Sequence, residues 1–390
     1  FGVLIFIDDY FNCLTVGAVM RPVTDKTKIS RAKLAYLIDA TAAPICMIAP
    51  ISSWAAAVTK FAPEGQGISL FCQAIPYNFY SLLTFVFVIA ITLMKFDYGP
   101  MKLHEMNAMK GDLFTSGKKD DSTEDDEPAT SKGKVIDLVL PIVFLIIVGV
   151  LALVYVGGFM GEDGKGFIDA FADTDATVGL PLGGIIALVA TIIYFIARRL
   201  VTFKEAMECI PKGFVAMVPA ILILTMATSL KNITGLLDSD AFVKASLESA
   251  GALNYFLPAI IFLVACGISF ATGTSWGTFG ILIPIVVSIF PVGSTLGIIG
   301  MSACLAGSVC GDHCSPISDT TIMSSAGARC DHINHVSTQL PYSLTVAAIS
   351  FVNFLIAPFI QNAWICIVIG AVMTVATLFV IKLVTSKKEA

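Results

Sequence analysis

The stretch Gly311-Asp-His-Cys-Ser-Pro-Ile-Ser-Asp-Thr-Thr321 lies inside a long apolar segment of the chain. It packs two carboxylates, a histidine and four hydroxyls into eleven residues. Pro316 cannot continue the helical hydrogen-bond ladder, so we expect it to break a helix and free backbone carbonyls. Asp312 and Asp319 are seven residues apart, about two helical turns, and would share one face if the helix were continuous.

The composition places this polar stretch in a membrane protein. Of 390 residues, 56% are apolar and only 14% are charged, whereas soluble domains have roughly 25% charged residues. Runs such as Leu138–Val156 and Trp364–Ile381 reach the length of about 20 apolar residues that crosses a bilayer. We therefore predict an all-α polytopic membrane protein in contact with the lipid bilayer. Soluble enzymes and nucleic-acid-binding proteins are excluded.

The apolar runs predict about ten to eleven membrane segments. One run, Tyr255–Phe290, is too long for a single crossing, and Thr272-Gly-Thr-Ser-Trp-Gly-Thr278 interrupts it. We expect this run to form a helical hairpin, either re-entrant or making two full passes. The candidate crossings are Phe1–Met20, Ala35–Val58, Ile68–Leu93, Ile136–Val156, Val178–Ala197, Phe214–Leu230, Tyr255–Phe290, Met301–Ala326, Pro341–Gln361 and Ala363–Val384.

Lys and Arg residues gather in alternate loops, which sets the expected orientation. By the positive-inside rule these loops face the cytoplasm, so we expect an inner (plasma) membrane protein with a cytoplasmic C-terminus. One of them, 96–134, is polar, acidic and without apolar periodicity, and we expect a flexible cytoplasmic linker there rather than a regulatory site. The expected cytoplasmic segments are 21–34, 95–134, 198–212, 327–339 and the tail.

Two pairs of stretches resemble each other at an offset of about 264–266 residues. The pairs are Phe6-Ile-Asp-Asp-Tyr-Phe-Asn12 with Phe270-Ala-Thr-Gly-Thr-Ser-Trp276, and Ala49-Pro-Ile-Ser-Ser53 with Ser315-Pro-Ile-Ser-Asp319. Loop 21–34 is basic, whereas its counterpart 285–300 carries no charge. The two loops should therefore lie on opposite sides of the membrane, as in the inverted repeats of secondary transporters.

The repeat divides the chain into four parts. We expect residues 1–95 to be the C-terminal part of a first repeat, 96–134 the linker, 135–361 a second repeat, and 362–390 a final helix and tail. The second repeat has about 130 residues before its hairpin tip, and the first has almost none. We therefore expect that the N-terminal part of the first repeat is missing from this chain.

Ionisable groups inside a membrane are costly and mark ion pathways. Carboxylate, hydroxyl and carbonyl oxygens are the ligands that a small hard cation prefers. A single carboxylate that binds either a proton or a cation is the simplest site that could exchange the two. We predict Asp312 and Asp319 as alternating ligands of sodium and protons. The other candidate ligands are Asp8, Asp9, Asn12, Thr274, Ser275, Ser315, Ser318 and Thr320.

His313 and Asp39 are candidate proton-relay residues. Two alternatives stay open for them: His313 could support a neighbouring ligand, and Asp39 could lie at the cytoplasmic mouth, close to the basic loop.

The motifs resemble those of the NhaC family of sodium/proton antiporters, part of the larger ion-transporter superfamily. The matching stretches are Gly273–Thr278, Gly311–Thr321, Phe6–Asn12 and Asp39–Trp54. The resemblance implies two inverted repeats, each with a hairpin and a broken helix, around a cation site near the midplane. It also implies exchange of external protons for internal sodium. Members usually run longer at the N-terminus, in agreement with a truncated chain.

These expectations describe a secondary transporter rather than an enzyme. We expect no cofactor beyond the transported sodium and protons. A homodimer is possible. The alternative is an ion-coupled organic-acid, amino-acid or drug exchanger of the same family. An organic anion would favour Lys or Arg facing the cavity, and none lies deep within a predicted span.

Overall fold

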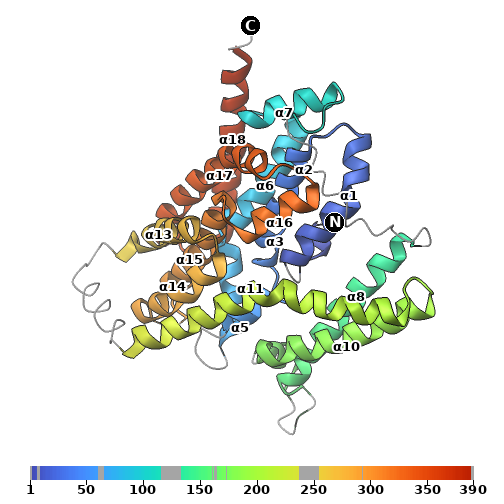
Figure 1. Ribbon diagram of the computed structural model, residues 1–390. Helices are drawn as coiled ribbons and strands as arrows, with labels where there is room; N and C mark the ends of the chain where they lie inside the picture. The colour runs from blue at the N-terminus through green and yellow to red at the C-terminus, as the bar shows by residue number, and fades with distance from the viewer. Residues whose placement is uncertain are drawn as a thin grey trace.

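The computed structural model describes residues 2–6, 9–59, 66–115, 133–159, 161, 165–172, 174–236, 254–291 and 293–387, and these form helices without a strand (Figure 1). The first half contains η1 (Gly2–Leu4), α1 (Asp9–Lys26), α2 (Arg31–Ala40), α3 (Ala43–Cys46), α4 (Ser53–Thr59), α5 (Gly67–Ala74), η2 (Ile75–Tyr77), α6 (Phe79–Met94) and α7 (Pro100–Met109). The second contains α8 (Val135–Val156), α9 (Phe167–Ala172), α10 (Ala176–Ala197), α11 (Phe203–Leu236), α13 (Leu257–Thr272), α14 (Ser275–Ile289), α15 (Thr295–Cys314), α16 (Asp319–Ala328), α17 (His332–Ile360) and α18 (Ala363–Lys387).

Apolar helices long enough to cross a bilayer confirm a multi-pass membrane protein. Among the described residues, five helices meet this condition, or six if the bent pair of α5–η2 and α6 forms one span. The α8 and α10 helices match two of the expected crossings closely, pack on each other, and stand apart from the larger bundle in Figure 1. The expected total of about ten to eleven segments stays a prediction.

The expected hairpin in Tyr255–Phe290 is present as α13 and α14, which meet at Gly273 and Thr274. Gly273 has φ +67°, a left-handed conformation that glycine adopts without strain. Thr274 then caps α14, because its side chain accepts a hydrogen bond from the Gly277 amide. Each helix has 16 residues or fewer, which is shorter than a full crossing.

Residues Met301–Ala326, expected as one crossing, are two helices instead. α15 ends at Cys314, residues 315–318 are not helical, and α16 starts at Asp319. The break predicted from Pro316 is therefore confirmed. Asp312 and Asp319 consequently do not share the face of one continuous helix.

Three other expected boundaries also need correction. The expected crossing Ala35–Val58 is divided into α2, α3 and α4. The expected loop 327–339 already contains the start of α17 at His332, because the Asp331 side chain caps that helix by accepting from the Asn334 amide. Part of the expected linker 96–134 forms α7, whose apolar residue Met101 is buried, while residues 116–132 lie outside the described part.

Glycines allow the helices around the break to approach closely. A Cβ on Gly307 or Gly311 would lie 2.4 or 2.2 Å from a backbone oxygen of α13. These two residues are one turn apart, so they form a small-residue strip typical of membrane helix pairs. A similar contact joins α1 to α16, where a Cβ on Gly17 would lie 2.4 Å from the carbonyl carbon of Gly327. The first contact places α13 beside α15, which precedes the break. The second places α1 beside α16, which follows the break.

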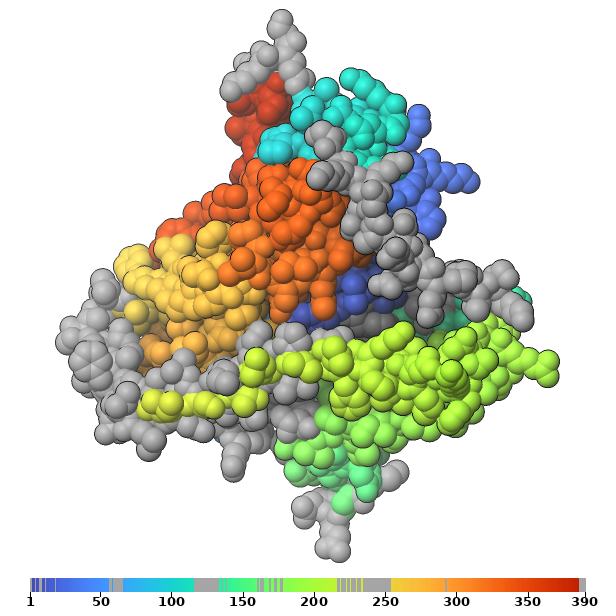
Figure 2. Space-filling view, in the orientation of Figure 1, coloured from blue at the N-terminus to red at the C-terminus, as the bar shows by residue number. Residues whose placement is uncertain are grey.

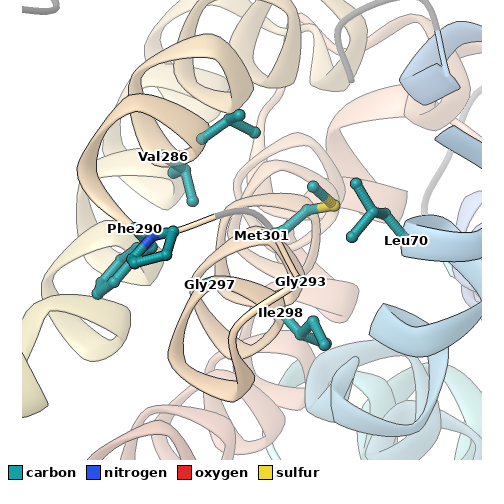
Figure 3. Close-up of a pocket in the computed structure, with 9 residues that line it drawn as sticks. Leu70, Val286, Phe290, Gly293, Gly297, Ile298 and Met301 are labelled. Carbon is teal, nitrogen blue, oxygen red and sulfur yellow. The ribbon is translucent and has the colours of Figure 1, made fainter. Parts of the chain in front are cut away.

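Figure 3 shows a small cavity of about 20 Å³ between α5, α14 and α15. Its wall includes Leu70, Val286, Phe290 and Met301. These side chains are apolar and offer no ligand for an ion.

We expect Gly311→Ala to force α13 and α15 apart, because the new Cβ meets the Cys266 carbonyl. Overpacking of this kind costs about 1–3 kcal/mol, so thermal unfolding in detergent should shift to a lower temperature. Gly267→Ala on α13 is the matched control, because its Cβ meets no atom within 4 Å. Equal melting temperatures for the two variants would contradict the packing described above.

Candidate functional site

Asp312 lies in the last turn of α15 and is 2% exposed. Its Oδ2 accepts a hydrogen bond of 2.8 Å from the Ser275 hydroxyl at the start of α14. Its Oδ1 has no hydrogen-bond partner among the described residues. A buried carboxylate oxygen of this kind is costly unless a proton or a cation occupies it.

The hairpin tip and the helix break touch each other at this carboxylate. A Cβ on Gly273 would lie 2.6 Å from the Ile317 carbonyl oxygen. The Ser315 hydroxyl donates to the Phe270 carbonyl over 2.8 Å and so ties the break to α13. Two irregular backbone segments that are distant in sequence therefore meet inside the protein, close to Asp312.

Asp319 is the first residue of α16 and is half-buried. One carboxylate oxygen accepts a hydrogen bond from the Tyr10 hydroxyl on α1, and the other accepts from the Thr320 amide over 2.8 Å. The charges of Asp312 and Asp319 act on each other across the break. The two carboxylates are therefore close enough for their charges to interact, although they lie on different helices.

The remaining hydroxyl candidates have structural partners. Ser318 caps α16 by accepting from the Thr321 amide, and its hydroxyl lies 3.1 Å from that of Thr320. Thr274 caps α14 in the same way. Ser275 donates a hydrogen bond to Asp312, and the Ser318 hydroxyl also interacts with that carboxyl group.

Asp39 is buried at the centre of a second polar cluster. Its Oδ2 accepts hydrogen bonds from Gln339 Nε2 at 2.7 Å and from the Thr321 hydroxyl at 3.1 Å. The Nε2 atoms of His335 and His313 lie 3.4 and 3.7 Å from the same oxygen. Asp39 is therefore enclosed by α2, α15, α16 and α17 and does not sit at an open mouth.

His313 connects this cluster to the surrounding aromatic residues. Its Nδ1 shares a hydrogen bond of 2.8 Å with the Tyr80 hydroxyl on α6, and its ring stacks against that of Tyr36. Its Nε2 faces Asp39. Either predicted role, relay or support, would therefore act on Asp39.

The first-half candidates separate into two groups. Asp9 is buried and accepts a hydrogen bond of 3.2 Å from Trp54 Nε1, whose ring packs against Trp276 of the hairpin. Asn12 Nδ2 lies within 2.9 Å of the carbonyl oxygens of Gly2, Ile5 and Thr41, and so holds η1 to the end of α2. Asp8 lies outside the described residues.

Several residues of these clusters were missing from the sequence predictions, among them Tyr10, His335 and Gln339. His335 and Gln339 fall in the expected loop 327–339, yet both are buried in α17. The Asp-x-x-Asn cap at Asp331 was the local signal that a helix starts there. Tyr10 is 309 residues from its partner Asp319, so no local signal pointed to it.

The chemistry of the site is acidic and rich in oxygen. Within the described ranges, no Lys or Arg pairs with Asp39, Asp312 or Asp319. The same ranges contain no group of three His, Cys, Asp or Glu side chains that could hold a metal ion. A cation bound by Asp312 would therefore take its other ligands from hydroxyl and carbonyl oxygens.

Comparisons with known proteins agree with this chemistry. Residues 45–359 match the Na⁺/H⁺ antiporter family. An uncharacterized protein of Haemophilus influenzae is 37% identical to the chain over 97% of its length and 73% of the relative's. The malate-2H⁺/Na⁺-lactate antiporter of Bacillus subtilis is 33% identical over 28% of the chain and 24% of its own length. The arginine/ornithine antiporter ArcD of Halobacterium salinarum is 35% identical over 25% of the chain and 21% of its own length. No solved structure matches.

We expect Gln339→Leu to destabilise the protein, because Asp39 and the His313 carbonyl each lose a buried donor. Leaving such groups without a partner costs about 1–3 kcal/mol, which thermal unfolding in detergent would detect. Gln73→Leu is the control, since Gln73 is exposed and bonds only to the Ser69 hydroxyl. A melting temperature unchanged in both variants would show that the cluster around Asp39 does not contribute to stability.

Proposed function

This chain belongs to the Na⁺/H⁺ antiporter family, and we propose that it exchanges cytoplasmic sodium for external protons by alternating access across the plasma membrane. The observation that carries the proposal is the buried Asp312 Oδ1, which has no partner among the described residues and lies where the hairpin tip meets the helix break. The C-terminus and the segment 96–134 face the cytoplasm in this proposal.

Asp312 supplies the competition that exchange requires. When Asp312 is ionised, its oxygens and the Ser275 hydroxyl form part of a shell for sodium, which prefers hard oxygen ligands. When a proton occupies the carboxyl group, the negative charge that attracts sodium is gone. One carboxylate therefore cannot hold both, and release of one substrate accompanies uptake of the other.

Asp319 links this competition to the packing of helices. Its hydrogen bond from Tyr10 joins α16 to α1, which also cross at Gly17 and Gly327. A proton or sodium ion on Asp319 weakens its acceptance of the Tyr10 hydrogen bond. Occupancy of the site would thus change the contact between an element of the first half and one of the second.

Proton transfer in this scheme uses the cluster around Asp39. Asp39 and His313 were predicted as relay residues, and His335 adds a second imidazole at 3.4 Å from Asp39. An imidazole can accept and release a proton near neutral pH. In this proposal the cluster takes up and releases protons at Asp39, which the Nε2 atoms of His313 and His335 approach within 3.7 and 3.4 Å.

We propose that the two repeats are inverted and that Asp8, Asp9 and Asn12 belong to the symmetry-related half of the site. The helix boundaries support the offset of this repeat. The sequence repeat has an offset of about 264–266 residues, and three pairs of helix ends in the structure differ by 265 or 266. The pairs are the starts of α4 and α16 (Ser53 and Asp319), the starts of α5 and α17 (Gly67 and His332), and the ends of α6 and α17 (Met94 and Ile360).

We expect Asp312→Asn to abolish sodium-dependent exchange. Everted vesicles with an acid-inside pH gradient, reported by a fluorescent amine, would receive sodium, lithium, potassium and then malate or lactate in turn. Wild-type protein should dissipate the gradient on addition of sodium, and the variant should not. The exposed Glu208→Gln is the control, as it removes a carboxylate outside the site. A sodium response that persists in Asp312→Asn, or a response to the organic anions alone, would overturn the proposal.

We expect Ser275→Ala to raise the sodium concentration that gives half-maximal exchange several-fold, because the shell loses one hydroxyl while the carboxylate stays. Ser288→Ala removes a hydroxyl from the same helix that bonds only to the Ile285 carbonyl, and it should leave the sodium dependence unchanged. The same vesicles provide the measurement. Equal sodium dependence in the two variants would exclude Ser275 from the shell.

A further inference from the structure

A pocket of about 280 Å³ lies between α6, α7 and α18, away from the carboxylate site. Two candidate membrane spans end beside it, because α6 ends at Met94 and the apolar part of α18 ends at Thr385. Helix α7 lies next to α18 at this end of the molecule (Figure 1), and the cyan surface of α7 adjoins the red surface of α18 in Figure 2. The pocket therefore opens at one surface of the membrane, the cytoplasmic one in the orientation proposed above.

Positive charge exceeds negative charge around this pocket. Lys95, Lys102 and Lys382 line it, together with the carboxylates of Asp97 and Glu105. Lys33 lies 2.7 Å from Asp97 and 3.7 Å from Glu105 and so partly neutralises both. Among the described residues, four lysines thus lie around two carboxylates.

Both carboxylates are also engaged by neutral donors. Asp97 accepts a hydrogen bond of 2.6 Å from the Tyr342 hydroxyl, and Glu105 accepts one of 2.6 Å from the Ser30 hydroxyl. Lys382 is held in place as well, because its Nζ donates to the Met94 carbonyl over 2.7 Å and lies 5.6 Å from the centre of the Phe96 ring. Both carboxylates that line the pocket therefore already have hydrogen-bond partners in the protein.

One side of the pocket is apolar. Met106 and Met109 line it and are 40% and 64% exposed, and Leu103 on the same helix is 54% exposed. The opposite face of α7, with Met101 and Ala108, is buried against the protein. A helix with one anchored face and apolar residues exposed at a membrane surface is typical of helices that lie in the interface between headgroups and acyl chains.

We propose that this pocket binds an anionic phospholipid of the adjoining leaflet, with Lys95 and Lys102 on the phosphate and the two methionines against the glycerol and upper acyl chains. Basic pockets at the ends of membrane helices attract anionic headgroups. A soluble phosphate would leave the exposed methionines uncovered, whereas a lipid covers them and meets the lysines at once.

The test is a native mass spectrometry titration of the purified full chain in neutral detergent with phosphatidylglycerol. Phosphatidylcholine and glycerol phosphate are titrated in parallel. We expect Lys95→Gln combined with Lys102→Gln to bind phosphatidylglycerol roughly 30-fold more weakly, since each lysine near a headgroup contributes about fivefold. The combined Lys204→Gln and Lys212→Gln variant is the control: it removes two exposed lysines of α11 and should bind as the wild type does.

A double variant that binds phosphatidylglycerol as tightly as the wild type would overturn the proposal. So would glycerol phosphate or phosphatidylcholine binding to the wild type as tightly as phosphatidylglycerol, because the site would then recognise a free phosphate or any lipid. If the double variant does not fold, acetylation of the wild-type lysines decides. Phosphatidylglycerol should protect Lys95 and Lys102 but not Lys212, and equal labelling of all three would count against the site.

Discussion

The central constraint on this structure is that a backbone group inside a membrane needs a partner within the protein. Two of the helix interruptions in the described part of the chain lie at Gly273 and Thr274 and over residues 315–318. Serine and threonine hydroxyls next to these interruptions cap the helices or bond to neighbouring carbonyls. Because the two irregular segments also touch, they form a polar site inside an otherwise apolar protein.

Small residues make that contact possible. The strip of Gly307 and Gly311 brings α13 onto α15, and the crossing of Gly17 with Gly327 brings α1 onto α16. The hydrogen bonds from Ser275 to Asp312 and from Tyr10 to Asp319 form between the same groups of helices. The close helix contacts and the two carboxylates therefore lie on the same helices, α15 and α16.

Local sequence signals predicted the features that depend on one residue type. Pro316 indicated the helix break, and the glycine and hydroxyl run at 272–278 indicated the hairpin, since both act through backbone geometry nearby. The same reasoning treated 327–339 as a loop because of its polar residues. Some of those polar residues proved to be buried: His335 lies 3.4 Å from Asp39 on α2, and Gln339 donates hydrogen bonds to Asp39 and to the His313 carbonyl on α15.

The amino-acid sequence alone determined that this is a helical membrane protein, where its helices break, and which carboxylates lie in apolar surroundings. These properties follow from hydrophobicity and backbone conformation, which are local. The tertiary structure alone decided that Asp312 belongs with Ser275, that Asp319 belongs with Tyr10, and that Asp39 is surrounded by His313, His335 and Gln339. Such pairings join residues up to 309 positions apart, and they arise only when helix packing satisfies polar groups that water cannot reach.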